Sequence, residues 1–195
     1  MRKLTLIPMI AVVIVLFQAC SGNKSNTITD SVTTTTDSSK MTTTTKDSTV
    51  MAANPDTAFA NKACVGGMAE VAIGKLALTK TSSPKIKDFA TMMITDHGKA
   101  NDELMAIAKA KGITLPATVD AEHQKKLDDL TKLTGNDFDK AYVAAMLGGH
   151  KKVLALLQHE AADGKDPELK AFATKTVPVV QMHLDAITKI NASMK

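Results

Sequence analysis

The stretch from Ser83 to Lys111 constrains the fold most strongly, because its apolar residues follow the period of a long helix. Steps of four and three residues recur on one side of it, at Ile86, Ala90, Met93, His97, Ala100, Leu104 and Ile107. This spacing places the side chains on one packed helix face. Ser83 and Pro84 are typical of a helix start, and Gly112 of a helix end. A helix about 40 Å long requires partners of similar length.

Three further stretches have the same helical period and supply such partners. They cover residues 55–80, 136–163 and 166 to near the end of the chain. A shorter helix is expected from its N-cap, Asp120, to Gly135. No stretch shows the period of two that a strand requires, and the predicted connections are short. We therefore expect an all-α, antiparallel four-helix bundle with an extra short helix between the second and third long helices.

Each long stretch carries one ligand-type side chain on its apolar side, close to its midpoint. These residues are Glu70, His97, His150 and His183. Midpoints of antiparallel helices lie at one height, so we expect the four side chains to meet in one interior layer. Imidazole and carboxylate groups together bind a divalent transition metal such as zinc, iron, manganese or copper. Asp96, next to His97, is the candidate for orienting an imidazole by accepting a hydrogen bond from the ring nitrogen that does not bind the metal.

A layer of this kind has a second interpretation. A histidine on a helix seam is usually a hydrogen-bonded core residue, and the four polar groups could instead fix the register of the helices. Two glycine pairs, Gly66–Gly67 and Gly148–Gly149, lie beside Glu70 and His150. Inside a helix each glycine costs up to about 1 kcal/mol relative to alanine. Either close helix contact or a small cavity accounts for them.

The N-terminal residues are typical of an exported lipoprotein. Arg2 and Lys3 precede a short apolar run that ends in FQAC at residues 17–20, a sequence that resembles a bacterial lipobox. We therefore expect residues 1–19 to be a lipoprotein signal peptide. Cys20 is expected to carry the lipid that anchors the protein to the membrane.

The residues after Cys20 divide into two parts. Residues 20–54 are rich in threonine and serine and are expected to form a disordered tether, and residues 55–195 form the helical domain. Cys64 remains as a single cysteine, expected in the core. This organisation places the protein on the periplasmic side of the bacterial cell envelope, as an outer-membrane lipoprotein.

Composition excludes several function classes. Apart from Arg2 the chain has no arginine, and it has no tryptophan and one tyrosine. It therefore lacks the bidentate phosphate contacts and stacking rings of nucleic-acid sites, and we expect no nucleic-acid partner. It contains no G-x-S-x-G motif, phosphate loop or glycine-rich dinucleotide turn, so hydrolase, nucleotide and dehydrogenase chemistry is not indicated. No motif indicates a protein partner.

A family resemblance rests on three segments within residues 59–190. They read FATMMITDHGKANDELMAIAKAKG, FDKAYVAAMLGGHKKVLALLQ and LKAFATKTVPVVQMHLDAI. They closely resemble the bacterial ferritin-like domain-of-unknown-function family 4142, whose members are often labelled outer membrane proteins. The resemblance implies an exported ferritin-like four-helix bundle and no settled activity.

The resemblance to ferritins has a limit in the ligand pattern. Ferritin-like di-iron sites use a Glu-x-x-His pair on each of two helices. Here the residues three before the histidines are Ile94, Leu147 and Val180. One metal ion, or none, fits this pattern better than a carboxylate-bridged di-iron centre.

Three functions agree with these patterns. The first is a lipid-anchored module that binds one transition metal ion for sequestration or delivery. The second is a non-enzymatic envelope or stress-related interaction protein whose His/Glu layer is structural. The third is a metal-dependent redox enzyme with an open coordination position. Because no nucleophile constellation is present, a non-enzymatic role is favoured over catalysis.

Overall fold

The computed structural model describes residues 54–194, which form five helices and contain no strand. The helices are α1 (Pro55–Lys80), α2 (Pro84–Ala110), α3 (Ala121–Thr131), α4 (Gly135–Asp163) and α5 (Pro167–Ala192). The predicted all-α class is therefore confirmed for this part of the chain. No helix within it combines the length and the hydropathy that crossing a membrane requires. The predicted signal peptide, the lipid site at Cys20 and residues 20–53 of the tether lie outside the described residues.

Local capping explains most of the helix starts. The side chain of Asn54 accepts a hydrogen bond from the backbone N–H of Asp56, at 3.0 Å, and Asp120 accepts one from His123, at 2.9 Å. Such bonds satisfy amide groups that the first turn of a helix leaves without partners. Ser83 occupies the predicted cap position of α2, but its side chain makes no cap hydrogen bond.

The boundary between the short helix and the third long helix differs from the prediction. The short helix α3 ends at Thr131, before the expected Gly135, because Gly135 has a left-handed φ of 55° and begins α4 instead. Glycine accepts this conformation without the steric cost that other residues incur. At the other end of the chain, α5 continues through Pro178 as one helix.

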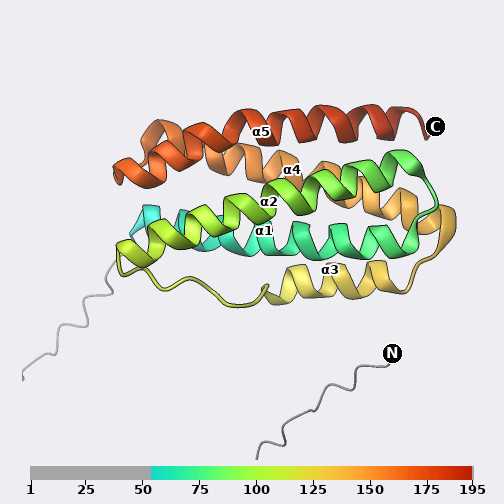
Figure 1. Cartoon of the computed structure of the whole chain (residues 1–195), viewed down its shortest axis with the longest axis horizontal. Helices are drawn as coiled ribbons and strands as arrows, with labels where there is room; N and C mark the ends of the chain where they lie inside the picture. The colour runs from blue at the N-terminus through green and yellow to red at the C-terminus, as the bar shows by residue number, and fades with distance from the viewer. Residues whose placement is uncertain (1–53, 195) are drawn as a thin grey trace, which may run out of the picture. The chain divides into compact units, whose positions relative to one another are not determined.

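The four long helices form a bundle in which α1 packs against α2 and α4, and α5 packs against α4 and α2 (Figure 1). Its interior has two apolar halves. The Phe59 half consists of Phe59, Ala60, Cys64, Leu104, Leu154, Leu157, Leu169, Phe172, Ala173 and Val180. The Tyr142 half consists of Ile73, Ala77, Ile86, Phe89, Ala90, Met93, Leu130, Phe138, Tyr142, Val143, Met146 and Ile187. As predicted, the single cysteine of the domain lies in the core.

The order of these halves along the chain gives the direction of each helix. α1 and α5 run from the Phe59 half to the Tyr142 half, whereas α2 and α4 run the opposite way. Every pair of packed long helices is therefore antiparallel. Since α2 and α4 run in the same direction, the chain between them must return along the bundle.

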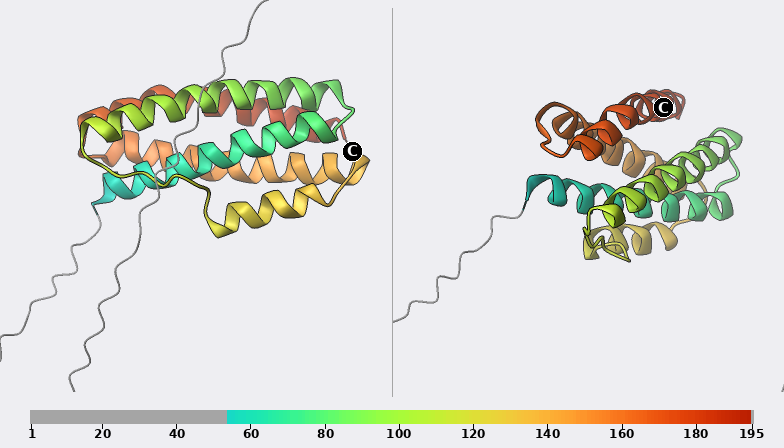
Figure 2. Two further views of the ribbon diagram at one scale, coloured as in Figure 1. Left: turned by 60° about the horizontal axis from the view of Figure 1, so that its bottom comes forward. Right: turned by 60° about the vertical axis from the view of Figure 1, so that its left-hand side comes forward.

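Residues 111–134 make this return, and α3 within them packs along α1 (Figure 2). The expectation that all connections are short was therefore wrong at this point. Hydrophobic periodicity defines the buried face of a helix but carries no information about its direction, so it could not reveal a crossover. The antiparallel packing survives because the crossover places α4 beside α1.

Asp56 joins the first turn of α1 to the start of α5. Its carboxylate is buried and accepts backbone hydrogen bonds from Lys165, at 3.1 and 3.2 Å, and from Asp166, at 2.7 Å. Hydrogen bonds to a charged acceptor are stronger than neutral ones, and a buried donor left without a partner is costly. Asp56 therefore holds the α4–α5 turn in place.

We predict that Asp56→Ala lowers the free energy of unfolding by about 2 kcal/mol, because two partly buried backbone N–H groups lose their acceptor. Urea unfolding followed by circular dichroism measures the change. Asp102→Ala is the control, because Asp102 is exposed on α2 and takes part in no ion pair among residues 54–194. Equal stabilities of the two variants would contradict the assigned role.

Candidate metal centre

A polar layer separates the two apolar halves of the bundle. Glu70, His97, His150 and His183, one from each long helix, are only 5%, 6%, 0% and 0% exposed. On every helix the polar residue lies between the segment that enters the Phe59 half and the segment that enters the Tyr142 half. The four side chains that the sequence singled out are thus brought together in the interior.

The three imidazole rings meet closely. Their centroids are 5.6 Å apart for His97 and His150, 5.2 Å for His97 and His183, and 5.6 Å for His150 and His183. One ring nitrogen from each lies within 4.8 Å of the corresponding nitrogens of the other two. Three nitrogens bound tetrahedrally to one ion at about 2.0–2.1 Å are roughly 3.4 Å apart. The rings would therefore move closer together on binding an ion.

Two of the rings have one nitrogen fixed by a hydrogen bond. His150 donates Nδ1–H to the backbone carbonyl of Met146 at 2.8 Å, and His183 donates Nε2–H to the carboxylate of Asp96 at 3.0 Å. Both acceptors lack a hydrogen, so each ring must carry its proton on the bonded nitrogen. The other nitrogen then presents a lone pair. This is how neighbouring groups orient a metal-binding histidine.

Glu70 lies between His97 and His150 on the side of their Nδ1 atoms. Its Oε2 is 3.1 Å from His97 Nδ1 and its Oε1 is 3.4 Å from His150 Nδ1, although neither contact has hydrogen-bond geometry. The carboxylate thus lies close to both rings but makes no hydrogen bond to either. Glu70 is not among the three groups whose ligand atoms converge within residues 54–194.

The remaining ring nitrogens have no partner. His97 Nε2, His150 Nε2 and His183 Nδ1 are buried and make no hydrogen bond to any described residue. An unsatisfied buried polar atom costs roughly 1–3 kcal/mol, so native interiors contain few of them. Three such atoms on three adjoining rings require an explanation other than core packing.

Electrostatics keep all three rings uncharged. Burial lowers the pKa of His97 to about 3, with repulsion from His150 and His183 adding to the effect. Burial also lowers the pKa of His150 to about 4 and lowers that of His183. A neutral imidazole is the form that binds metal ions. Burial has the opposite effect on the Glu70 carboxyl, whose pKa rises to about 8 despite the positive charge of Lys126.

The layer is reached from one side of the bundle between α2 and α5. A cavity of about 200 Å³ there is lined by Asp96, His97 and His183 together with Lys175 and Glu103, whose Nζ and Oε2 atoms pair at 2.7 Å. A small ion or molecule can therefore approach the rings from solvent.

The other residues weighed from the sequence lie outside the layer. His159 is exposed, whereas His123 is half-buried and its Nδ1 lies 2.7 Å from Asp120 Oδ1. Asp96 contacts His183 on α5, across the helix interface from its sequence neighbour His97. The role of the Met146 carbonyl was missed, and its only sequence signal is its position four residues before His150.

One family model matches most of the chain. Residues 41–190 match the model of a family described as a domain of unknown function, DUF4142. The chain belongs to this family. The match covers all three segments on which the resemblance rested, and the family name assigns no activity. No curated protein and no solved structure matches the chain, so the function of this DUF4142 protein has to be argued from its own residues.

We predict that the metal-free DUF4142 domain is most stable near pH 6.5. Below the ordinary histidine pKa of 6.5 the unfolded chain binds protons on these histidines, whereas the buried rings of the folded protein stay neutral. The free energy of unfolding therefore falls as pH falls. Glu70 has the opposite sign: its pKa rises from 4.5 to about 8 on folding, so stability falls as pH rises toward 8. Below pH 6.5 the destabilising effect of the three histidines is larger than the stabilising effect of the one carboxyl.

Urea titrations between pH 4.5 and 8.5 in the presence of a chelator test this prediction. In Glu70→Gln the decline above pH 6.5 should disappear, while the acid limb of the curve stays. A decline above pH 6.5 that is the same in both proteins would show that Glu70 is not its source.

Proposed function

We propose that this protein binds one divalent transition metal ion through His97, His150 and His183. The observation that carries the proposal is the set of three buried, unpartnered imidazole nitrogens, one on each of three adjoining rings. In this arrangement Asp96 holds the His183 ring, the Met146 carbonyl holds the His150 ring, and Glu70 lies beside His97 and His150. Zinc, iron, manganese and copper all accept imidazole ligands.

The main alternative is a purely structural layer that fixes the helix register. A structural layer is stable when its polar groups satisfy one another. Here the hydrogen bonds to the Met146 carbonyl and to Asp96 engage one nitrogen each of His150 and His183 and leave the second unpartnered, and His97 Nε2 has no partner either. A buried nitrogen without a partner on each of the three rings favours a ligand at the centre.

The ligand set favours one ion over a di-iron centre. Three histidines with a single nearby glutamate provide too few carboxylates to bridge two metals. Three protein ligands also leave at least one coordination position open, as in catalytic sites. Sequestration or delivery of the ion requires only these three ligands. Redox turnover would also require a substrate at the open coordination position, which the cavity beside Asp96 would allow it to reach.

Elemental analysis of the protein purified without a histidine tag tests metal binding. We expect about one transition metal ion per chain after loading, and none in the double variant His97→Ala/His150→Ala. His159→Ala is the matched control, because His159 is an exposed histidine of α4 that does not belong to the buried layer. Cobalt(II) loading adds a spectroscopic readout of nitrogen coordination.

The outcomes separate the three functions. Absence of stoichiometric metal in every loading condition, in a folded protein, would leave the structural layer as the better interpretation. Metal-dependent turnover of peroxide or superoxide that a chelator abolishes would identify the redox enzyme.

We predict that Asp96→Asn weakens metal binding about 10- to 100-fold, the usual effect of losing the group that orients a histidine ligand. The amide cannot act as a charged acceptor for His183 Nε2–H, although it has nearly the same shape. Asp88→Asn, an exposed change on the same helix, is the control. Competition with a chromophoric chelator measures both affinities. Unchanged affinity would show that Asp96 does not act through His183.

We further propose that the domain is held on the periplasmic side of the outer membrane by lipid on Cys20. The basic residues, apolar run and FQAC sequence of residues 1–20 support this location. Metabolic labelling with a fatty-acid analogue should label the full-length protein and not Cys20→Ser. If neither protein is labelled, the proposed lipid anchor is wrong.

We also propose that the bundle is related to the ferritin-like folds. The support is its topology: antiparallel packed neighbours joined by one long crossover between the second and third long helices. A crystal structure whose helix directions differ from this order would exclude the relationship.

A further inference from the structure

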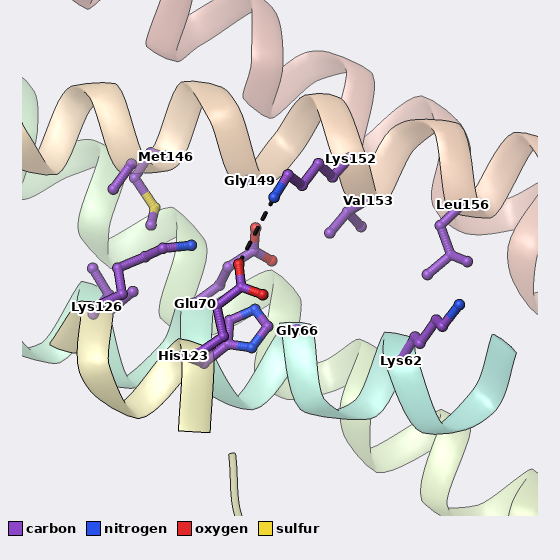
Figure 3. Close-up of a pocket in the computed structure, with 14 residues that line it drawn as sticks. Lys62, Gly66, Glu70, His123, Lys126, Met146, Gly149, Lys152, Val153 and Leu156 are labelled. Carbon is purple, nitrogen blue, oxygen red and sulfur yellow. Dashed lines mark ion pairs between the residues drawn. The ribbon is translucent and has the colours of Figure 1, made fainter. Parts of the chain in front are cut away.

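A separate pocket lies on the side of the bundle that α3 covers. It encloses about 280 Å³ between α1, α3 and α4 (Figure 3). Glu70 forms part of its inner wall, but both carboxylate oxygens are inaccessible to solvent and face the imidazoles. The pocket is therefore separated from the three rings by this side chain.

Two glycines without tight contacts line the pocket. A Cβ at Gly66 would lie 3.7 Å from Val153 Cγ2, and one at Gly149 would lie 3.6 Å from Glu70 Oε1, both ordinary contact distances. Gly67 differs, because its Cβ would overlap the side-chain amide of Asn101. Close helix approach thus explains Gly67 alone. Gly66 and Gly149 weaken their helices and leave space between α1 and α4.

The interior of the pocket is apolar. Its wall is built from small and branched side chains of α1 and α4, namely Ala69, Ile73, Ala145, Met146, Val153 and Leu156. A pocket of roughly 300 Å³ with a mostly apolar wall is at the lower end of small-molecule sites. Its size and lining suit a short hydrocarbon chain.

The rim of the pocket is cationic. Lys62 of α1, Lys126 of α3 and Lys152 of α4 border it together with one carboxylate, that of Glu122, and Figure 3 shows Lys126 and Lys152 extending toward the cavity from their two helices. Within residues 54–194 neither Lys62 nor Lys126 takes part in an ion pair, and Lys152 makes only a loose, exposed contact of 3.8 Å with Glu122. An exposed pair of this kind contributes little. At least two positive charges are thus available to a ligand.

We propose that this pocket binds a small amphiphilic carboxylate, with its apolar chain between α1 and α4 and its anionic head between Lys126 and Lys152. The lysines are separate point charges, and the lining contains no arginine, the side chain that binds a phosphate through two parallel hydrogen bonds. The site needs no metal, so it is independent of the function proposed above.

Calorimetric titration of the full-length protein in chelator, with octanoate as the probe, tests the proposal. Octanoate should bind with one-to-one stoichiometry, and octylamine and octyl phosphate should bind about tenfold more weakly or not at all. Absence of octanoate binding at millimolar concentration would overturn the proposal. Octylamine binding as tightly as octanoate would overturn the charge assignment, and tighter binding of octyl phosphate would overturn the carboxylate.

Two variants locate the binding site. Gly66→Leu should fill the cavity and weaken octanoate binding by about tenfold or more, whereas Gly148→Leu, on the open surface of α4, should leave it unchanged. Lys126→Gln removes one charge without adding bulk and should weaken octanoate binding while leaving octanol unaffected. Thermal unfolding confirms that each variant is folded. If folded Gly66→Leu and Lys126→Gln both bind octanoate with unchanged affinity, octanoate binds elsewhere and the proposed binding site is wrong.

Discussion

The removal of four polar groups from water at the centre of the bundle is the constraint on which the structure depends. Glu70 and three histidines lie in a layer with apolar side chains on both sides, where a charge is expensive. The protein meets this cost by keeping the rings neutral and by giving two of them a fixed acceptor. One buried nitrogen of each ring stays without a hydrogen-bond partner, as do both carboxylate oxygens of Glu70.

Much of the fold could be predicted because local rules determine it. Asn54, Asp120 and Asp166 cap helices through short-range hydrogen bonds, and the sequence around each shows them directly. The buried layer was predictable for a geometric reason. The midpoint of a helix stays at the same level along the bundle axis when the direction of the helix is reversed. The crossover therefore does not move any of the four side chains out of the layer. The crossover through α3 escaped prediction because helical periodicity is the same in both directions.

The partners of the layer residues were harder to predict. Asp96 is adjacent to His97 in sequence, but successive residues of a helix point about 100° apart, so the two side chains diverge and Asp96 contacts α5. The glycine pairs show the same limit. Both members of the pair Gly66–Gly67 look alike in sequence, yet one meets Asn101 of α2 and the other faces a cavity. Only the relative placement of neighbouring helices separates these cases.

Each long helix contributes one member of the polar layer, and this has a consequence for assembly. The chain presents Glu70 first and His183 last, so no partly synthesised or truncated chain that lacks α5 contains all three imidazoles. Closure of the centre therefore coincides with docking of the final helix. A ligand held there would report that the entire domain has folded, and its release would require the helices to separate.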